Sequence, residues 1–133
     1  MLFRSAHHYP LMRMLVAAKS RGLQAIDGPY AKIGDTEGLR VAATSSAALG
    51  YDGKWVLHPA QADVVNAAFT PSPDEYARAA RILDAYQRAT SVDRRGAVML
   101  DGEMIDEASR KLALAIVGKG QAAGRLPTLG VWP

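Results

Sequence analysis

Residues 96–110, GAVMLDGEMIDEASR, are the part of the sequence whose local structure is most narrowly constrained. Short apolar or β-compatible runs flank Asp101-Gly102, and an Asp-Gly pair supplies the two positive φ angles of a tight type I′ turn. These features predict a β-hairpin over residues 97–105. Directly after it, the carboxylate of Asp106 is placed to accept the free amides of a helix that starts at Glu107. The predicted order is therefore hairpin, carboxylate and helix.

Length and composition limit what this motif can belong to. The 133 residues suffice for one domain or for one sizeable part of a larger one. Hydrophobic residues make up 49% of the chain and charged residues 22%, as in ordinary soluble globular proteins. The absence of cysteine excludes disulfides and thiolate metal sites, and it agrees with a cytoplasmic location.

Charge and hydropathy argue against two classes of partner. The 16 basic and 13 acidic residues give a net charge of +3, but they are interspersed, so a nucleic-acid-binding face has only weak support. The apolar run at residues 11–18 is interrupted by Arg13 and lacks a cleavage site. We therefore predict neither a signal peptide nor a membrane span, and neither nucleic acid nor membrane as a partner.

Short apolar strands alternate with amphipathic helices in the first half of the chain, which predicts an α/β fold. We expect a helix over residues 10–21, a strand over 23–27, a helix over 36–49 capped by Asp35, and a strand over 54–57. Strands joined in this way pair in parallel, and ligands of such folds bind beyond the carboxyl ends of the strands.

Asp27 and His58 both fall at these strand ends, and spacing alone leaves two interpretations of each equally open. Asp27 either contacts a ligand or bonds the amides of the turn at Gly28-Pro29. His58 either contacts a ligand or packs under a loop. Trp55 is expected in the core or in a pocket wall.

The Pro-rich stretch at residues 70–73 is the best domain boundary in the sequence. We divide the chain into residues 1–71 and residues 72–133. A short helix is predicted over residues 59–69, immediately before the boundary.

The second part of the chain begins with a strong helix signal. Ser72 and Glu75 form a capping box, with a proline between them, for a helix that reaches about Ala89. The hairpin and a helix over residues 107–119 follow, and the chain is predicted to be irregular from Gly120 onward. No dinucleotide, P-loop, zincin or nucleophile-elbow motif is present, so these residue patterns alone identify no reaction.

Three stretches, in order, resemble the C-terminal portion of the citrate lyase β-subunit-like family of CoA-ester lyases. They are GLQAIDGPYAKIGDTEGLRVAATSSAALGYDGKWVLHPAQ, TPSPDEYARAARILDAY and GAVMLDGEMIDEASRKLA. The resemblance extends from about residue 8 to about residue 119.

The resemblance implies a (β/α)₈ TIM barrel, of which residues 1–71 form the last two β/α units. Residues 72–133 then form a C-terminal lid of helix, β-hairpin, helix and irregular tail. Such barrels need about 250 residues, so the chain is expected to be a truncated form or to need partner chains, such as the missing N-terminal barrel portion. The family also implies a homo-oligomer whose lid serves a neighbouring subunit.

The implied chemistry is carbon-carbon cleavage of 3-hydroxyacyl-CoA thioesters of the malyl-CoA or citramalyl-CoA type, to an acyl-CoA plus glyoxylate or pyruvate. Mg²⁺ is implied as the cofactor, with ligands on strands that this chain lacks. The family's Met-Ile-Asp motif falls on residues 104–106, which makes Asp106 the catalytic acid/base. His58, Pro59 and Asp27 are implied to bind the substrate or support its site.

Two alternatives stay open at this stage. From local physics Asp106 is a helix cap, and the resemblance adds a catalytic role that is compatible with capping. The absent metal-binding half leaves it uncertain whether the chain is an enzyme by itself, and it also fits a noncatalytic assembly or binding module derived from the barrel.

Overall fold

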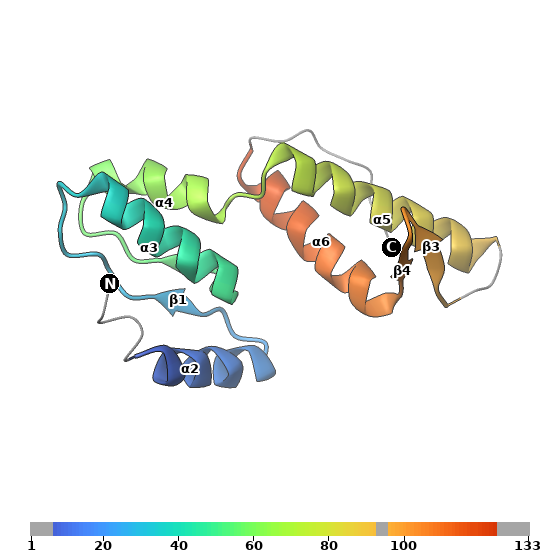
Figure 1. The fold of residues 1–133 in the computed structure, drawn as a ribbon, viewed down its shortest axis with the longest axis horizontal. Helices are drawn as coiled ribbons and strands as arrows, with labels where there is room; N and C mark the ends of the chain where they lie inside the picture. Colours follow the sequence, from blue (N-terminus) through green and yellow to red (C-terminus); the bar gives the residue numbers. More distant parts are fainter. Residues whose placement is uncertain (1–6, 93–95, 125–133) are drawn as a thin grey trace. The chain divides into compact units, whose positions relative to one another are not determined.

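The computed structural model describes residues 7–92 and 96–124, which fall into two compact units divided between Phe69 and Thr70 (Figure 1). The N-terminal unit contains α2, β1, α3, β2, η1 and α4, and the C-terminal unit contains α5, β3, β4 and α6. Among the described residues, no helix has both the length and the apolar character needed to cross a membrane.

The N-terminal unit has a β-α-β order. Its elements are α2 (His8–Ser20), β1 (Ile26–Asp27), α3 (Thr36–Leu49), β2 (Gly53–Lys54), the 3-10 helix η1 (Pro59–Gln61) and α4 (Ala62–Phe69). The two strands pair in parallel, with Ile26 opposite Gly53 and Asp27 opposite Lys54. The mixed helix and sheet content and this parallel pair agree with the predicted α/β class.

Both strands are shorter than predicted. β1 starts late, at Ile26, because the Leu23 N–H donates to the Ala18 carbonyl of α2, whereas β2 ends early, at Lys54. The last bond of the backbone ladder between them runs from the Trp55 N–H to the Asp27 carbonyl, at 3.0 Å. Two residues further on, the Leu57 N–H donates instead to the side chain of Gln61, at 2.8 Å. The apolar residues predicted to extend the second strand therefore belong to a loop.

The helix signals in this unit are largely confirmed. The Asp35 carboxylate accepts the Gly38 N–H at 2.9 Å, and Gly50 ends α3 in the left-handed region with φ 102°. α2 starts at His8, two residues earlier than predicted, and has no side-chain cap. Proline fits the first turn of a helix, where its missing N–H costs nothing, so α2 accommodates Pro10.

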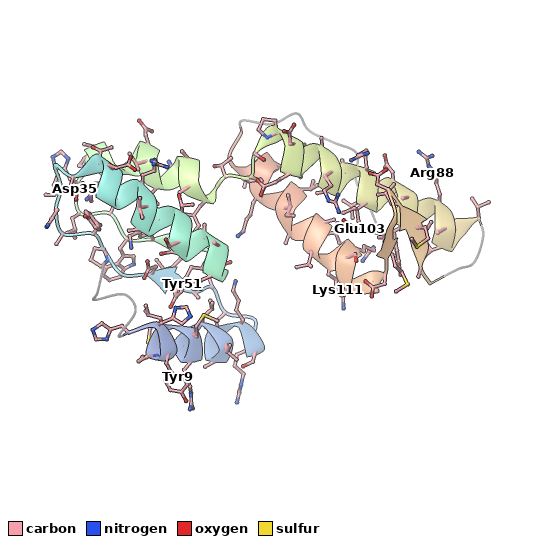
Figure 2. The ribbon with its side chains drawn as sticks, in the orientation of Figure 1. Tyr9, Asp35, Tyr51, Arg88, Glu103 and Lys111 are labelled. Atoms are coloured by element: carbon pink, nitrogen blue, oxygen red, sulfur yellow. The ribbon has the colours of Figure 1, made fainter. Side chains whose placement is uncertain are left out.

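Two small clusters of buried residues form the core of this unit. One consists of Leu39, Ala43 and Val65, between α3 and α4. The other consists of Leu15, Ala25 and Tyr51, and it packs α2 against the segments that lead into the two strands. The Tyr51 hydroxyl also donates to the Leu11 carbonyl at 3.0 Å, so its polar end is satisfied (Figure 2).

The C-terminal unit is a helical pair with a hairpin. Its elements are α5 (Pro73–Ser91), β3 (Val98–Leu100), β4 (Glu103–Ile105) and α6 (Glu107–Ala122). Leu100 lies opposite Glu103, and Asp101 and Gly102 have φ angles of 50° and 83°. The two-residue turn with two positive φ angles is the predicted one.

α5 and α6 run side by side in opposite directions (Figure 1) and share one cluster of buried residues. Its members are Tyr76, Ala79, Leu83, Ala113 and Val117. The predicted capping box of Ser72 and Glu75 is present at the start of α5. α6 continues through Ala122, so the irregular tail predicted from Gly120 is wrong for its first residues, and residues 125–133 lie outside the described part.

Candidate functional site

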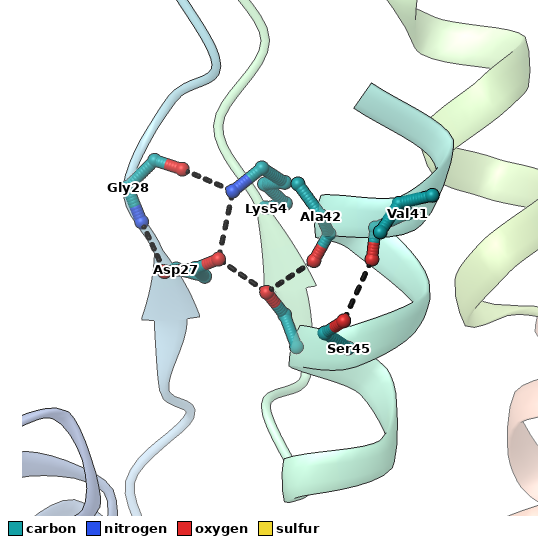
Figure 3. A network of polar contacts seen from close by, with 7 residues as sticks. Asp27, Gly28, Val41, Ala42, Ser45 and Lys54 are labelled. Carbon is teal, nitrogen blue, oxygen red and sulfur yellow. Dashed lines mark hydrogen bonds and ion pairs between the residues drawn. The ribbon is translucent and has the colours of Figure 1, made fainter. Parts of the chain in front are cut away.

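A buried ion pair lies at the carboxyl ends of β1 and β2 (Figure 3). The Lys54 ammonium donates to Asp27 Oδ2 at 2.7 Å, and the two side chains are only 3% and 8% exposed. The Gly28 N–H donates to Asp27 Oδ1 at 2.9 Å, and the Ser46 hydroxyl of α3 also bonds the carboxylate. The turn-amide interpretation of Asp27 is therefore confirmed, and the carboxylate is held by several donors at once.

A second group of polar contacts joins the loops that follow the two strands. Gln61, only 1% exposed, accepts the Leu57 N–H at 2.8 Å and donates to the Tyr30 carbonyl at 2.9 Å. The Tyr30 hydroxyl in turn donates to Asp35 at 2.6 Å. That bond is the main reason why the pKa of Asp35 is lowered and the pKa of Tyr30 is raised.

His58 and Pro59 lie at the end of the second loop. His58 is exposed, and its Nδ1 accepts the Ala60 N–H at 3.1 Å, so the ring caps η1 and its other nitrogen carries the proton in the neutral form. Pro59 is the first residue of η1. The alternative that His58 packs under a loop is wrong, because its side chain faces outward.

An exposed apolar segment precedes His58. Trp55, Val56 and Leu57 are 66%, 41% and 53% exposed. Trp55 was expected in the core or in a pocket wall, and within this unit it is neither. Lys54 points toward Asp27 and α3, so alternation along an extended chain directs the neighbouring Trp55 to the opposite side, where this unit offers no cover.

Asp106 sits where β4 passes into α6, in the C-terminal unit. It is exposed and caps the helix: its carboxylate accepts the backbone N–H of Ser109 at 2.9 Å and the Ser109 hydroxyl at 3.0 Å. These two bonds, the backbone one first, lower the pKa of Asp106. A helix N-terminus favours a negative charge for the same reason.

A shallow groove of about 350 Å³ lies beside Asp106, within the same unit. Ser109, which bonds Asp106, is part of its lining, together with apolar side chains of α5, β4 and α6 such as Ile82, Met104 and Leu112. Two exposed ion pairs join α5 to the hairpin, Arg78 with Glu103 and Arg81 with Asp101. Asp106 is thus bonded to a residue of the groove lining, and the hairpin that precedes it is tied to α5.

The predicted site residues therefore fall into two groups. Asp27, His58 and Pro59 lie at the strand ends of the N-terminal unit, whereas Asp106 belongs to the C-terminal unit. The structure adds Ser46, Lys54 and Gln61, which were not predicted as site residues. Ser46 carried a usable signal, because a hydroxyl on the inward face of an otherwise apolar helix needs a buried partner.

The described residues do not fit the magnesium site that the family implies. Within residues 7–92 and 96–124, no three His, Cys, Asp or Glu side chains converge to hold an ion. Asp27, the buried carboxylate at the strand ends, has its charge balanced by Lys54. The carboxylate oxygens that Mg²⁺ prefers are therefore not gathered in this part of the chain.

Parallel strands joined by a helix, with polar side chains gathered beyond their carboxyl ends, define an α/β protein. No family model matches the chain. Individual proteins match the chain, both among curated proteins and among solved structures.

The chain is 36% identical over 116 residues to the L-malyl-CoA/beta-methylmalyl-CoA lyase of Rhodobacter capsulatus, a match that covers 87% of this chain and 36% of that protein. It is 35% identical over 108 residues to the (3S)-malyl-CoA thioesterase of Cereibacter sphaeroides, which covers 81% of this chain and 38% of the relative.

Two solved structures have a similar fold. The protein CitE of Mycobacterium tuberculosis, in complex with magnesium, acetoacetate and coenzyme A, matches with a TM-score of 0.73 and 31% identity, over 87% of this chain and 42% of that one. A citrate lyase of Burkholderia xenovorans matches with a TM-score of 0.72 and 25% identity, over 91% and 37%.

The chain belongs to the family of CoA-ester lyases represented by these malyl-CoA and citrate lyases. It spans somewhat more than a third of the length of the relatives that it matches.

Proposed function

We propose that the chain is the C-terminal part of a carbon-carbon lyase for 3-hydroxyacyl-CoA thioesters of the malyl-CoA or citramalyl-CoA type. In this proposal, residues 1–71 supply the last two β/α units of a (β/α)₈ barrel and residues 72–133 form its lid. The observation that carries the proposal is an exposed carboxylate, Asp106, held at the N-terminus of α6 in a chain that is 36% identical to a malyl-CoA lyase.

Asp106 is suited to the proton transfer that this reaction needs. In cleavage, the 3-hydroxyl group of the acyl-CoA gives up its proton and becomes the carbonyl of the released oxo acid, while the electron pair of the broken carbon-carbon bond leaves the acyl-CoA as an enolate. The enolate carbon then takes a proton, and in the reverse direction a base removes it. The pKa of Asp106 is lowered by the cap, so its carboxylate is ionised at neutral pH, which is the form that the base role in bond formation requires. In cleavage, dehydration of the site by the bound substrate would favour the protonated form.

The remaining site residues have supporting roles in the proposal. His58 and Pro59 line the acyl-CoA pocket at the end of the second strand, and Asp27 shapes the neighbouring turn from within its ion pair. The lid serves the active site of a neighbouring subunit, which makes the assembly a homo-oligomer. The Mg²⁺ ligands would be supplied by barrel strands other than β1 and β2, because the described residues gather no set of them.

The lyase proposal is tested by oxo-acid release. We would incubate the 133-residue chain with Mg²⁺ and malyl-CoA or citramalyl-CoA, alone and mixed with the R. capsulatus lyase. A chimaera in which the matching 116 residues of that lyase are replaced by those of this chain provides the complete barrel. We expect the chimaera to release glyoxylate or pyruvate.

Asp106→Asn should lower the kcat of the chimaera by about 10²–10⁴-fold, because it removes the proton-transfer group. The matched control is Asp101→Asn, which makes the same chemical change in the same hairpin but at a residue that pairs with Arg81. It should leave kcat unchanged. Equal loss in both variants would contradict the assigned role of Asp106.

The lyase proposal would be refuted if the chain alone and a folded chimaera released no oxo acid and the mixture released no more than the R. capsulatus lyase by itself. The same mixtures address the second candidate, a noncatalytic assembly module, which is favoured by the exposed apolar segment at residues 55–57. Binding of the chain to the relative without any increase over the relative's own turnover would support it. Light scattering tests the homo-oligomer, which a folded monomer in solution would contradict.

A further inference from the structure

Side chains continue the hydrogen bonding between the two strands beyond the last backbone bond. The backbone ladder ends with the Trp55 N–H, which donates to the last residue of β1. Beyond that point the Lys54 ammonium donates to the Gly28 carbonyl at 2.6 Å, and the Gln61 amide donates to the Tyr30 carbonyl at 2.9 Å. Two carbonyls of the first loop are thus held by side chains from the second strand and the helix after it (Figure 3 shows the Lys54 contacts).

The first loop is also fixed from its own side. The Gly28 N–H is bonded to the Asp27 carboxylate, and Pro29 has no N–H to satisfy. The hydroxyl of Tyr30 is bonded to Asp35, the N-cap of α3. The backbone between the end of β1 and the start of α3 is therefore anchored at several points.

The two bracing side chains are among the most buried polar groups of the unit. Gln61 is 1% exposed and uses both ends of its amide, because its carbonyl oxygen also accepts the Leu57 N–H. The Lys54 side chain is 3% exposed. Removing a buried partner leaves the other group unsatisfied at the full cost of desolvation, so these contacts oppose rearrangement of either loop.

We propose that Lys54 and Gln61 are positioning residues that hold loop 28–35 against loop 55–58, so that the thioester-binding surface at this end of the sheet is formed before the thioester arrives. The inference rests on the proposed function for the identity of the ligand. The backbone that Gln61 fixes carries the exposed side chains of Leu57 and His58, so the brace sets where these groups meet a ligand. A surface ordered in advance binds more tightly because no ordering cost remains.

The test measures amide hydrogen exchange at Leu57 in the 133-residue chain, and malyl-CoA binding by calorimetry, without Mg²⁺, in the chimaera that provides the complete barrel. Gln61→Met keeps a side chain of similar size but loses both bonds. We expect faster exchange at Leu57 and a thioester Kd raised about tenfold, the equivalent of one to two hydrogen bonds. The control is Lys19→Met, which breaks the ion pair of Lys19 with Asp52 in the same unit. It should change neither the exchange rate at Leu57 nor the thioester Kd.

A second variant separates positioning from simple filling of space. In Gln61→Glu, the neutral carboxylic acid accepts the Leu57 N–H and donates to the Tyr30 carbonyl, whereas the ionised form repels that carbonyl. We expect the ratio of its Kd to the wild-type Kd to fall from about tenfold near pH 8 toward one as the pH is lowered to about 5. Titratable groups of the surrounding loops, Tyr30, Asp35 and His58, are common to both proteins, so their effect cancels in the ratio.

The outcomes distinguish the two proposals. A folded wild-type chimaera that binds no malyl-CoA contradicts the proposed function, and protection of the Leu57 amide then leaves the brace in place. Thioester binding that is equally tight in the wild type and in Gln61→Met overturns the positioning role. Rapid exchange at Leu57 in the wild type overturns the brace itself.

Discussion

The two units of the molecule satisfy their polar groups in opposite ways. In the C-terminal unit the two helix caps and the ion pairs between α5 and the hairpin are exposed, and each cap joins residues three apart: Ser72 with Glu75 and Asp106 with Ser109. In the N-terminal unit the decisive contacts are buried and distant in sequence: Lys54 with Asp27, and Gln61 with Tyr30.

This difference separates two kinds of stability. Each exposed cap or ion pair contributes little to the free energy of unfolding, so the loss of one has a small effect. Replacing both partners of a buried ion pair by apolar residues changes the free energy of unfolding little. Replacing only one partner leaves an isolated buried charge, which is strongly destabilising. We therefore expect substitutions at polar residues to be far more damaging in the N-terminal unit than in the C-terminal one.

The largest expected effect follows from Lys54→Met, which leaves the Asp27 carboxylate buried without its cation. The free energy of unfolding of the N-terminal unit should fall by about 3–5 kcal/mol. Urea titration monitored by the methyl signals of Leu39 measures this unit separately. The control is Lys19→Met. The side chains of Lys19 and its partner Asp52 are 42% and 17% exposed, so losing this ion pair should lower the free energy of unfolding by less than about 1 kcal/mol. Equal losses in the two variants would remove the proposed difference between buried and exposed pairs.

Core truncation should destabilise the two units equally. Leu39 and Leu83 are both 2% exposed, one in each unit. Replacing either by alanine should lower the free energy of unfolding of its own unit by about 2–5 kcal/mol, since each creates a cavity. Methyl signals of the unmutated unit report whether the effect stays local. If Leu83→Ala also unfolded the N-terminal unit, the division into separate units would be wrong.

A cap substitution tests the weaker contacts of the C-terminal unit. Ser72→Ala removes the bond from the Glu75 N–H to the Ser72 hydroxyl, one of the two bonds of the capping box. It should lower the free energy of unfolding of this unit by about 1 kcal/mol, measured by urea titration of the Leu83 methyl signals. Ser45→Ala is the control, because the Ser45 hydroxyl is exposed and bonds only back onto its own helix. It should be neutral or slightly stabilising for its unit.

The smallest expected effect concerns the pH dependence of the Asp106 cap. Its folded pKa is lowered, so the stabilising contribution is complete above the unfolded value of about 3.9 and is lost as the pH falls through the folded pKa. Carboxyl ¹³C chemical shifts should place its midpoint below that of an aspartate in an unfolded peptide. Ser109→Ala should raise this midpoint only in part, because the backbone bond is the larger cause. A midpoint at the peptide value would show that the cap does not form.

The parts of the fold that could be predicted are those that depend on contacts between residues close in sequence. The hairpin, the capping box and the Asp35 cap each rest on residues within a few positions of one another, so local chemistry was sufficient. The strands over 23–27 and 54–57 were predicted too long, because their length is set by how far two distant segments stay paired. The end of α6 was predicted too early, because Gly120 is a residue that often ends a helix. In the folded chain Gly120 is buried and the helix continues past it.

For the candidate site, sequence reasoning located the strand-end positions and left their roles open. The structure shows that Asp27 is bound by Lys54 and Gly28 and that His58 caps η1 with its ring exposed. Gln61 was missed because a glutamine after His-Pro gives no local sign of burial, and its partners at Tyr30 and Leu57 become evident only in the folded chain. The roles of Asp27, His58, Pro59 and Asp106 in catalysis or binding stay predictions.

Local sequence sets the turns, the caps and most helix starts of this protein, since those depend on φ preferences and on hydrogen bonds within one helical turn. The sequence by itself also determined the family, through residues in a preserved order. Only the tertiary structure decided which polar side chains are buried together, because burial depends on pairing between segments about 30 residues apart. It is this pairing that joins Lys54 to Asp27 and Gln61 to Tyr30 at the end of the sheet.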